Sequence, residues 1–244
     1  MSPQAAIRIS HLKKSFASKQ VIKDCNMCIE QGTIYGFLGP NGAGKTTVFK
    51  LLMGFLTPDS GNIEILGSNM PENRNLLLSK IGSLIEAPTF YEHLSARKNL
   101  EIHLNYMGVT GIGVEKALQM VGLPDTEEKE VAKFSLGMRQ RLGIARALIH
   151  QPQILILDEP INGLDPMGVK QMRELFLNLS SQSGITVLLS SHILSEIEHV
   201  ADKVGVIVDG RIVHETNLAH IKADYKGSLE DYFFNLMSGG NSHD

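Results

Sequence analysis

Two kinds of apolar spacing divide the chain. Up to about residue 67 the apolar residues come in short alternating runs, which are typical of strands. A helical spacing of three and four residues interrupts these runs at residues 45–56. The strands predicted in this part are residues 6–12, 21–30, 33–39 and 61–67.

Helical spacing dominates the next part of the chain, from residue 86 to residue 150. Apolar residues recur there at intervals of three and four, which predicts helices at residues 95–108, 113–123 and 136–150. We therefore expect a helical subdomain at about residues 87–150.

Strands and helices alternate in the remainder. Residues 153–160 form a continuous apolar run that ends in two acids, the pattern of a strand buried on both faces of a parallel sheet. A helix, a buried strand, a second helix and a strand hairpin follow, at residues 168–184, 185–191, 192–201 and 203–215. This alternation predicts an α/β fold with a mostly parallel sheet, which we expect to form a single domain of residues 1–244.

The tail, about residues 216–244, carries one amphipathic segment, "SLEDYFFNLMSG". Its apolar residues share one helical face. We expect a short helix that packs Tyr232, Phe233 and Leu236 on the domain.

Composition narrows the classes of function. The chain has 244 residues, 43% of them hydrophobic, which is enough to bury a sizeable core. Its 23 Lys and Arg nearly balance 26 Asp and Glu, so we expect no nucleic-acid partner. No apolar run approaches 18 residues and the first ten residues lack the features of a signal peptide. We therefore expect a cytoplasmic protein that does not itself span a membrane.

The segment "GPNGAGKTT", residues 39–47, follows an apolar strand and opens a helix. Gly39, Gly44, Lys45 and Thr46 fit the pattern G-x-x-x-x-G-K-[ST]. Glycines let successive backbone N–H groups converge on an anion, and the helix adds the positive end of its dipole. Lys45 then reaches the β- and γ-phosphates, and Thr46 offers its hydroxyl to magnesium. The segment predicts a nucleoside triphosphate site, and the alternative is a glycine-rich turn without a ligand.

Two acids end the buried strand "ILILDE". Asp158 emerges beside the glycine loop, where it holds magnesium directly or through water. Glu159 is the candidate to orient or deprotonate the attacking water. The alternative is that the two acids merely cap the segment that follows.

From these residues onward the chain resembles the ATP-binding cassette (ABC) ATPases, over nearly its whole length. Residues 133–166 carry "FSLGM", "ILILDE" and "NGLDP" in the order of that family. The resemblance implies a P-loop core with a mostly parallel sheet, an N-terminal antiparallel β subdomain and a helical subdomain. It also implies an ATPase that uses ATP and Mg²⁺, and it adds Asn41, Gly42 and Thr47 to the ATP-binding residues.

The family's second contact with ATP falls on "FSLGM", which stands where the family has its signature L-S-G-G-Q. The resemblance implies that Ser135 and Gly137 contact the γ-phosphate of an ATP held by a second copy. Exposed amides at a helix N-terminus suit an anion, although a helix cap alone also explains Ser135. In "NGLDP", Asp165 is implied to reach across the interface between the two copies.

Two further residues take roles from the resemblance. His192 follows a buried strand, as does the family's switch histidine, which hydrogen-bonds the γ-phosphate and the attacking water. Phe16 occupies the place where the family stacks an aromatic ring on adenine, although a core position is the alternative.

The chain also departs from the common pattern of the family. Glu86 stands where most members carry glutamine, and as a carboxylate it still takes magnesium or a water. Leu136 and Met138 replace glycine and glutamine in the signature. These departures, with "NGLDP", resemble the branch of ATPase subunits that serve exporters giving self-protection against bacitracin and lantibiotic peptides.

The resemblance also implies partners. Two copies, or this chain and a sister ATPase, pair head to tail around two ATP molecules. A separate transmembrane permease docks near residues 86–100, where Phe90 and Tyr91 are surface candidates, so the chain is expected to lie peripherally on the cytoplasmic face of the membrane. Competing functions are a soluble ABC protein of translation or DNA repair, and a small-molecule kinase on a P-loop scaffold.

Overall fold

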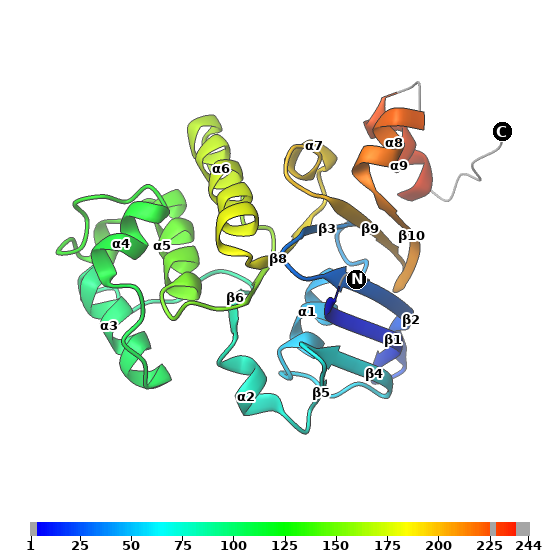
Figure 1. Ribbon diagram of the computed structural model, residues 1–244, viewed down its shortest axis with the longest axis horizontal. Coiled ribbons are helices and arrows are strands. Elements are labelled where there is room, and N and C mark those ends of the chain that lie inside the picture. Colours follow the sequence, from blue (N-terminus) through cyan, green and yellow to red (C-terminus); the bar gives the residue numbers. More distant parts are fainter. Residues whose placement is uncertain (1–3, 225–227, 238–244) are drawn as a thin grey trace.

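The structure is a computed structural model that describes residues 4–224 and 228–237. One sheet of ten strands runs through the part of the chain that is described (Figure 1). The strands are β1 (Ala5–Phe16), β2 (Lys19–Glu30), β3 (Ile34–Leu38), β4 (Ser60–Ile65), β5 (Ser68–Met70), β6 (Ile81–Leu84), β7 (Ile154–Leu157), β8 (Thr186–Ser191), β9 (Lys203–Val208) and β10 (Arg211–Asn217).

The sheet has an antiparallel part and a parallel part. Its strand order is β5-β4-β1-β2-β10-β9-β3-β8-β7-β6. Strands β5, β4, β1 and β2 pair antiparallel, whereas β9, β3, β8, β7 and β6 pair parallel. The hairpin of β9 and β10 joins the two parts, because β10 also pairs with β2. Strands β3, β7 and β8 therefore lie side by side and end at the same edge.

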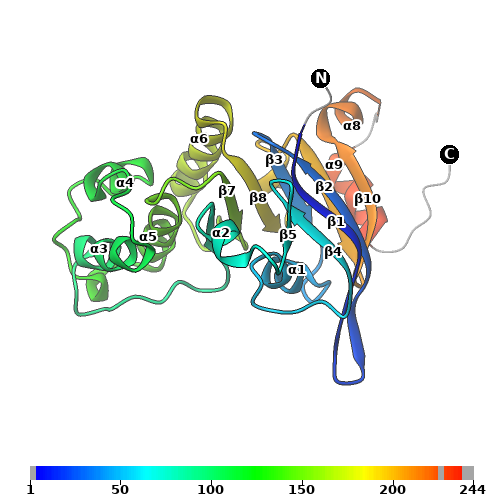
Figure 2. The same ribbon diagram turned by 60° about the horizontal axis from the view of Figure 1, so that its bottom comes forward.

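The helices fall into three groups (Figure 1). Helices α3, α4 and α5 form a block to one side of the sheet, α1, α2, α6 and α7 lie close to it, and α8 and α9 gather near β9 and β10 (Figures 1 and 2). Their bounds are α1 (Lys45–Leu52), α2 (Arg74–Leu78), α3 (Ala96–Met107), α4 (Val114–Met120), α5 (Leu136–Leu148), α6 (Pro166–Ser183), α7 (Leu194–Ile197), α8 (Leu218–Asp224) and α9 (Leu229–Met237), with a short 3₁₀ turn at Val131–Lys133.

Two apolar clusters hold this arrangement together. One joins the block of α3, α4 and α5 to α6, α7 and the parallel strands. The other joins α1 to both the antiparallel and the parallel parts of the sheet. Every residue of β3 and β7 is buried, as expected for strands covered on both faces. These strands provide a rigid edge for the loops that follow them.

The predicted fold class is confirmed, and the tail is packed as expected. Phe233 of α9 is fully buried, and Tyr232 and Leu236 pack against the same apolar cluster. Within the described residues, no helix combines the length and apolar character that a membrane crossing needs.

Some elements differ from the sequence-based expectation. Strand β6 was not predicted, because Gly82 and Ser83 interrupt its apolar pattern. The glycine has a packing reason: a Cβ at position 82 would lie 2.0 Å from the carbonyl oxygen of Ala147, in α5. The helix expected at residues 192–201 is a single turn, α7, and α1 ends four residues earlier than expected because Gly54 adopts a left-handed backbone with φ of 64°.

Candidate active site

The glycine loop lies between β3 and α1, at the edge where the parallel strands end. Gly44 is the residue before the helix and has φ of 114°, a backbone that other residues rarely adopt. A Cβ at this position would also lie 2.6 Å from Cδ1 of Ile22. The first N–H groups of α1 have no partner within the helix, so they and the helix dipole favour an anion at this end.

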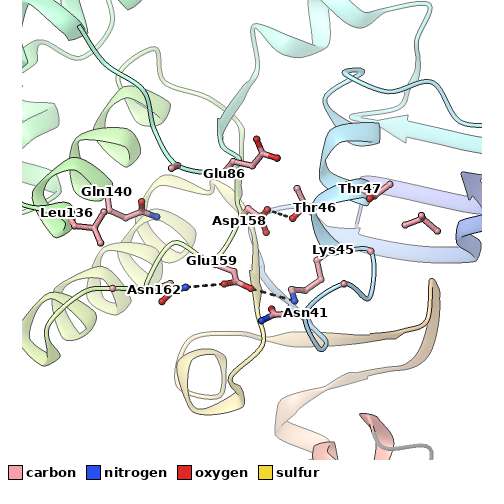
Figure 3. A pocket seen from close by; sticks show the side chains of 15 residues that line it. Asn41, Lys45, Thr46, Thr47, Glu86, Leu136, Gln140, Asp158, Glu159 and Asn162 are labelled. Carbon is pink, nitrogen blue, oxygen red and sulfur yellow. Dashed lines mark hydrogen bonds and ion pairs between the residues drawn. The ribbon is translucent and has the colours of Figure 1, made fainter. Parts of the chain in front are cut away.

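A cavity of about 680 Å³ opens beside this loop (Figure 3). It brings together many of the residues predicted from sequence motifs far apart in the chain. Its lining comprises Val21, Asn41, Gly42, Gly44, Lys45, Thr46, Thr47, Glu86, Ala87, Leu136, Gln140, Asp158, Glu159, Asn162 and Gly163.

Lys45 is the buried cation of the cavity, with 6% of its side chain exposed. Its Nζ donates to the carbonyl oxygen of Gly39 at 2.7 Å and to that of Pro40 at 3.3 Å. Oε1 of Glu159 lies 3.6 Å away. Burial lowers the pKa of the ammonium, and the carboxylates of Glu159 and Asp158 oppose that shift. Lys45 is therefore held in the site by two backbone carbonyls and a nearby carboxylate, and phosphate oxygens would compete with these partners for its ammonium group.

Thr46 and Asp158 are neighbours in the lining of the cavity. Thr46 Oγ1 donates to Oδ2 of Asp158 at 2.6 Å, and Ser190 Oγ donates to its Oδ1 at 2.5 Å. Oxygen donors of this kind fit Mg²⁺, which keeps several waters and substrate phosphates among its ligands. Among the residues that the structure describes, no group of three or more His, Cys, Asp or Glu is placed to bind a metal ion.

Glu159 is held from several sides. Its Oε1 lies 3.2 Å from Nδ1 of His192, and its Oε2 accepts from Nδ2 of Asn162 at 3.3 Å. The residue has φ of 48°, a left-handed backbone that costs on the order of 1 kcal/mol for a side chain other than glycine. Such strain is maintained by the surrounding contacts, and it turns the carboxylate into the cavity (Figure 3).

Glu86 lines the cavity but turns its carboxylate away from Asp158 (Figure 3). Its Oε1 pairs with Nζ of Lys50, on α1, at 2.5 Å. The residue follows β6 and also has a left-handed backbone, with φ of 64°. The positive charge of Lys50 therefore balances the negative charge of Glu86.

The signature residues Ser135 and Gly137 line a second cavity, of about 610 Å³, together with Asp165. Ser135 caps α5, because its Oγ accepts from the N–H of Met138 at 3.2 Å. Asp165 caps α6 in the same manner, with Oδ1 accepting from the N–H of Gly168 at 2.8 Å. Ser135 and Gly137 thus line a different cavity from Lys45 and Thr46, and the two cavities adjoin at Leu136 and Gly163, which line both. Leu136 is 70% exposed.

Phe16 lies outside the lining of both cavities. It ends β1 in the hairpin that extends beyond the body of the molecule, the blue hairpin in Figure 2. Its side chain is 43% exposed and has Nζ of Lys14 at 5.6 Å from the ring centroid. Val21, in the next strand, does line the first cavity. The exposed ring excludes the core position that was the alternative for Phe16.

Three residues of the site were not predicted from the sequence: Asn162, Ser190 and Lys50. Asn162 begins the segment in which only Asp165 was predicted, and Lys50 follows the glycine loop in α1. Ser190 had a visible signal, since it is a polar residue in a strand that is buried along its whole length.

Known proteins share both the sequence and the fold of this chain. Residues 22–162 match the ABC transporter family. The bacitracin transport ATP-binding protein BcrA of Bacillus licheniformis is 48% identical over 92% of this chain and 74% of its own length. The lantibiotic transport ATP-binding protein SrtF of Streptococcus pyogenes is 42% identical over 95% of this chain and 97% of its own length.

A solved structure described as the ATP-binding subunit of an ABC transporter has a TM-score of 0.84 to this one at 26% identity, over 95% of this chain and 99% of that chain. The resemblance inferred from the motifs is confirmed by these matches. The chain therefore belongs to the ABC transporter family, as an ATP-binding subunit of the kind that couples ATP hydrolysis to transport.

Proposed function

We propose that two copies of this chain, or one copy and a sister ATPase, close head to tail around ATP and thereby drive a separate membrane permease. The observation that carries the proposal is that the two groups of residues predicted to contact ATP line different cavities. Lys45 and Thr46 line one cavity, whereas Ser135 and Gly137 line another. A second chain that brings its signature to the first cavity would complete the site.

The first cavity supplies the groups that hold a triphosphate. The amides of the glycine loop and Lys45 bind its phosphates, with Asn41, Gly42, Thr47 and the loop start at Gly39 shaping the loop. Thr46 and Asp158 would hold Mg²⁺, and Glu86 would become a further oxygen donor at the rim only on releasing Lys50. The ion, when bound, neutralises charge that develops on the phosphate oxygens. Phe16 supports the adenine through its exposed ring.

Glu159 is the residue we assign to the attacking water. A carboxylate accepts the proton that the water loses as it attacks the γ-phosphorus, or orients that water by a hydrogen bond. His192 and Asn162 hold its two oxygens at 3.2 and 3.3 Å, so the carboxylate has a defined direction. Nζ of Lys45 lies 3.6 Å from the same carboxylate.

The docking place that we propose for the permease is on the block of α3 and α5. A cavity of about 700 Å³ there is lined by residues that include Phe90, Tyr91 and Tyr106. Tyr91 and Tyr106 are 56% and 90% exposed. A permease bound at this place would hold the chain on the cytoplasmic face of the membrane.

The substrate we propose is a peptide antibiotic that is exported. The support is the identity of 48% and 42% to proteins named for bacitracin and lantibiotic transport. Asp165, exposed beside the second cavity, is assigned to the contact between the two ATPase chains.

The test is the solution mass and the turnover of the Glu159→Gln variant. The variant should bind ATP and lose about hundredfold or more of its turnover, because the amide does not accept the proton. With ATP and Mg²⁺ its mass should change from monomer to dimer, and without ATP it should stay monomeric. Glu174→Gln, an exposed carboxylate on α6, is the control and should turn over normally.

Two results would contradict the proposal. Near-normal turnover of Glu159→Gln would remove Glu159 from its role. A variant that binds ATP yet stays monomeric, both alone and with its permease, would exclude the head-to-tail pair of identical chains; a dimer formed only with another ATPase chain would select the sister pair.

A further inference from the structure

One buried hydroxyl in the site belongs to neither the glycine loop nor the acidic pair. Ser190 lies near the end of β8 and is fully buried. Strand β8 runs parallel to β7, with Leu189 opposite Leu157. Ser190 therefore sits beside the two residues that follow β7, Asp158 and Glu159.

The hydroxyl of Ser190 makes two hydrogen bonds at once. It donates to Oδ1 of Asp158 at 2.5 Å and accepts from the backbone N–H of Glu159 at 2.9 Å. A serine hydroxyl has one donor and two acceptor sites, so both bonds are compatible with one orientation of the proton. The bond to the carboxylate is charge-assisted and thus among the stronger kinds.

Each bond restrains a different part of the site. The first leaves Asp158 with both oxygens held, because Oδ2 accepts from Thr46 at 2.6 Å. The plane of that carboxylate is thereby fixed relative to the glycine loop. The second holds the N–H of a residue whose φ is 48°, and a strained backbone persists only where its surroundings determine it.

We propose that Ser190 is a positioning residue that fixes both carboxylates at the end of β7. Through Oδ1 it sets the direction in which Asp158 presents its free lone pairs to Mg²⁺, and through the N–H it sets the backbone that directs Glu159 at the water. Ser190 is fully buried and does not line the first cavity, so its effect would pass through the two acids. This inference rests on the proposed function, because it concerns the same metal and the same water.

Removal of the hydroxyl by Ser190→Ala should leave Oδ1 of Asp158 and the N–H of Glu159 unpaired. The half-saturating Mg²⁺ concentration should rise about tenfold and kcat should fall about tenfold, the effect expected for one lost hydrogen bond to a charged group. The affinity for a fluorescent ATP analogue in EDTA should stay within about twofold of the wild type, because the amides and Lys45 still hold the phosphates.

Two control variants separate positioning from stability. Thr186→Val removes another buried hydroxyl from the same strand, one that accepts from the N–H of Gly32 at 3.0 Å, far from the acids. It should leave the Mg²⁺ titration unchanged. Ser190→Thr keeps the hydroxyl and should retain most of the wild-type Mg²⁺ response. If the alanine protein does not fold, Ser190→Cys is the decisive variant, because its thiol is a weaker donor and should raise the half-saturating Mg²⁺ concentration.

The measurements are Mg²⁺ titrations of analogue binding and of steady-state ATP hydrolysis, with thermal unfolding of each variant. Wild-type Mg²⁺ dependence in Ser190→Ala would overturn the proposal, as would equal losses in Ser190→Ala and Thr186→Val. If the wild-type chain binds the analogue but does not hydrolyse ATP, the proposed function fails. The Mg²⁺ dependence of binding then still decides whether Ser190 positions Asp158.

Discussion

The two halves of the candidate site are built in different ways. In the loop half, residues 39–47 with Asp158 and Glu159, the Lys45 side chain is buried and the two acids are partly buried, while residues 40–42 are exposed. Its polar side chains bond to other groups of the same half or to residues beside it. The signature half, residues 135–138 with Asp165, is exposed, and Ser135 bonds to the N–H of its own helix. Because the polar groups of the loop half are hydrogen-bonded within the chain, this half is preorganised before a ligand binds. The exposed groups of the signature half can act on a ligand only when a partner surface brings that ligand to them.

If Ser135 is only a helix cap, the signature half makes no contact with ATP through this residue, and the comparison of the two halves fails. Ser135→Ala should leave ATP binding to the isolated chain intact and lower both ATP-dependent dimerisation and turnover about tenfold, since a hydrogen bond to a phosphate is charge-assisted. Native mass measurements with ATP and a phosphate-release assay check this expectation.

A closely matched control is available in α3. Ser95 caps that helix with the same geometry, its Oγ accepting from the N–H of Lys98 at 3.2 Å. Both alanine variants should lose about 1 kcal/mol of stability from the cap. If Ser95→Ala lowers turnover as much as Ser135→Ala, the effect is one of helix stability and not of contact with ATP.

Low pH should destabilise the block of α3, α4 and α5, in which α5 carries the signature residues, more than the loop half. His103 of α3 and His150, just after α5, have ring centroids 5.6 Å apart. Burial lowers the pKa of His103 to about 4, with smaller contributions from the charges of His150 and Arg146, and burial also lowers the pKa of His150.

The sign follows from where the proton binds. A lowered folded pKa means that the unfolded chain takes up the proton first, so stability is lost as pH falls from about 6.5 towards about 4. Between pH 7 and pH 5 the loss due to His103 should be about 1–2 kcal/mol. Urea unfolding at the two pH values should show a smaller loss in His103→Leu, and an unchanged loss would contradict the assignment.

The smallest effect is expected at the rim of the loop half. Lys50 and Glu86 are 33% and 63% exposed, so their ion pair should contribute no more than about 1 kcal/mol. Glu86→Gln should therefore leave nucleotide affinity nearly intact while changing the coupling of ATP hydrolysis to transport. The measurement is ATPase stimulation and transport in the reconstituted complex with the permease.

The control for this variant is Lys170→Gln, which breaks an exposed ion pair with Glu174 on α6, away from the first cavity and from the proposed docking place. It should change neither readout. If Glu86→Gln also leaves both stimulation and transport unchanged, position 86 has no part in coupling.

The motifs pointed to residues of the loop half that the structure brings into one cavity, because their spacing follows from local geometry. A loop that curls around phosphate needs glycines and a lysine at fixed offsets, so Lys45 and Thr46 could be found without a structure. The apolar run before Asp158 likewise indicated its place at the edge of a parallel sheet.

The contacts that complete the site could not be predicted in this manner. Ser190 meets Asp158 because β7 and β8 are neighbours, and Lys50 meets Glu86 because α1 packs beside the end of β6. Both pairings depend on the tertiary arrangement and not on spacing along the chain. The same applies to β6, whose glycine serves the close approach of α5.

The end of β8 has a consequence for how this site can vary between related sequences. Three successive residues there hold three different parts: Ser190 bonds to Asp158, the carbonyl of Ser191 accepts from the N–H of Gly39 at 3.2 Å, and His192 reaches Glu159. Changes at contacting positions are rarely additive. A substitution in this tripeptide should therefore be tolerated, or not, according to its neighbours, so that the segment changes as a unit.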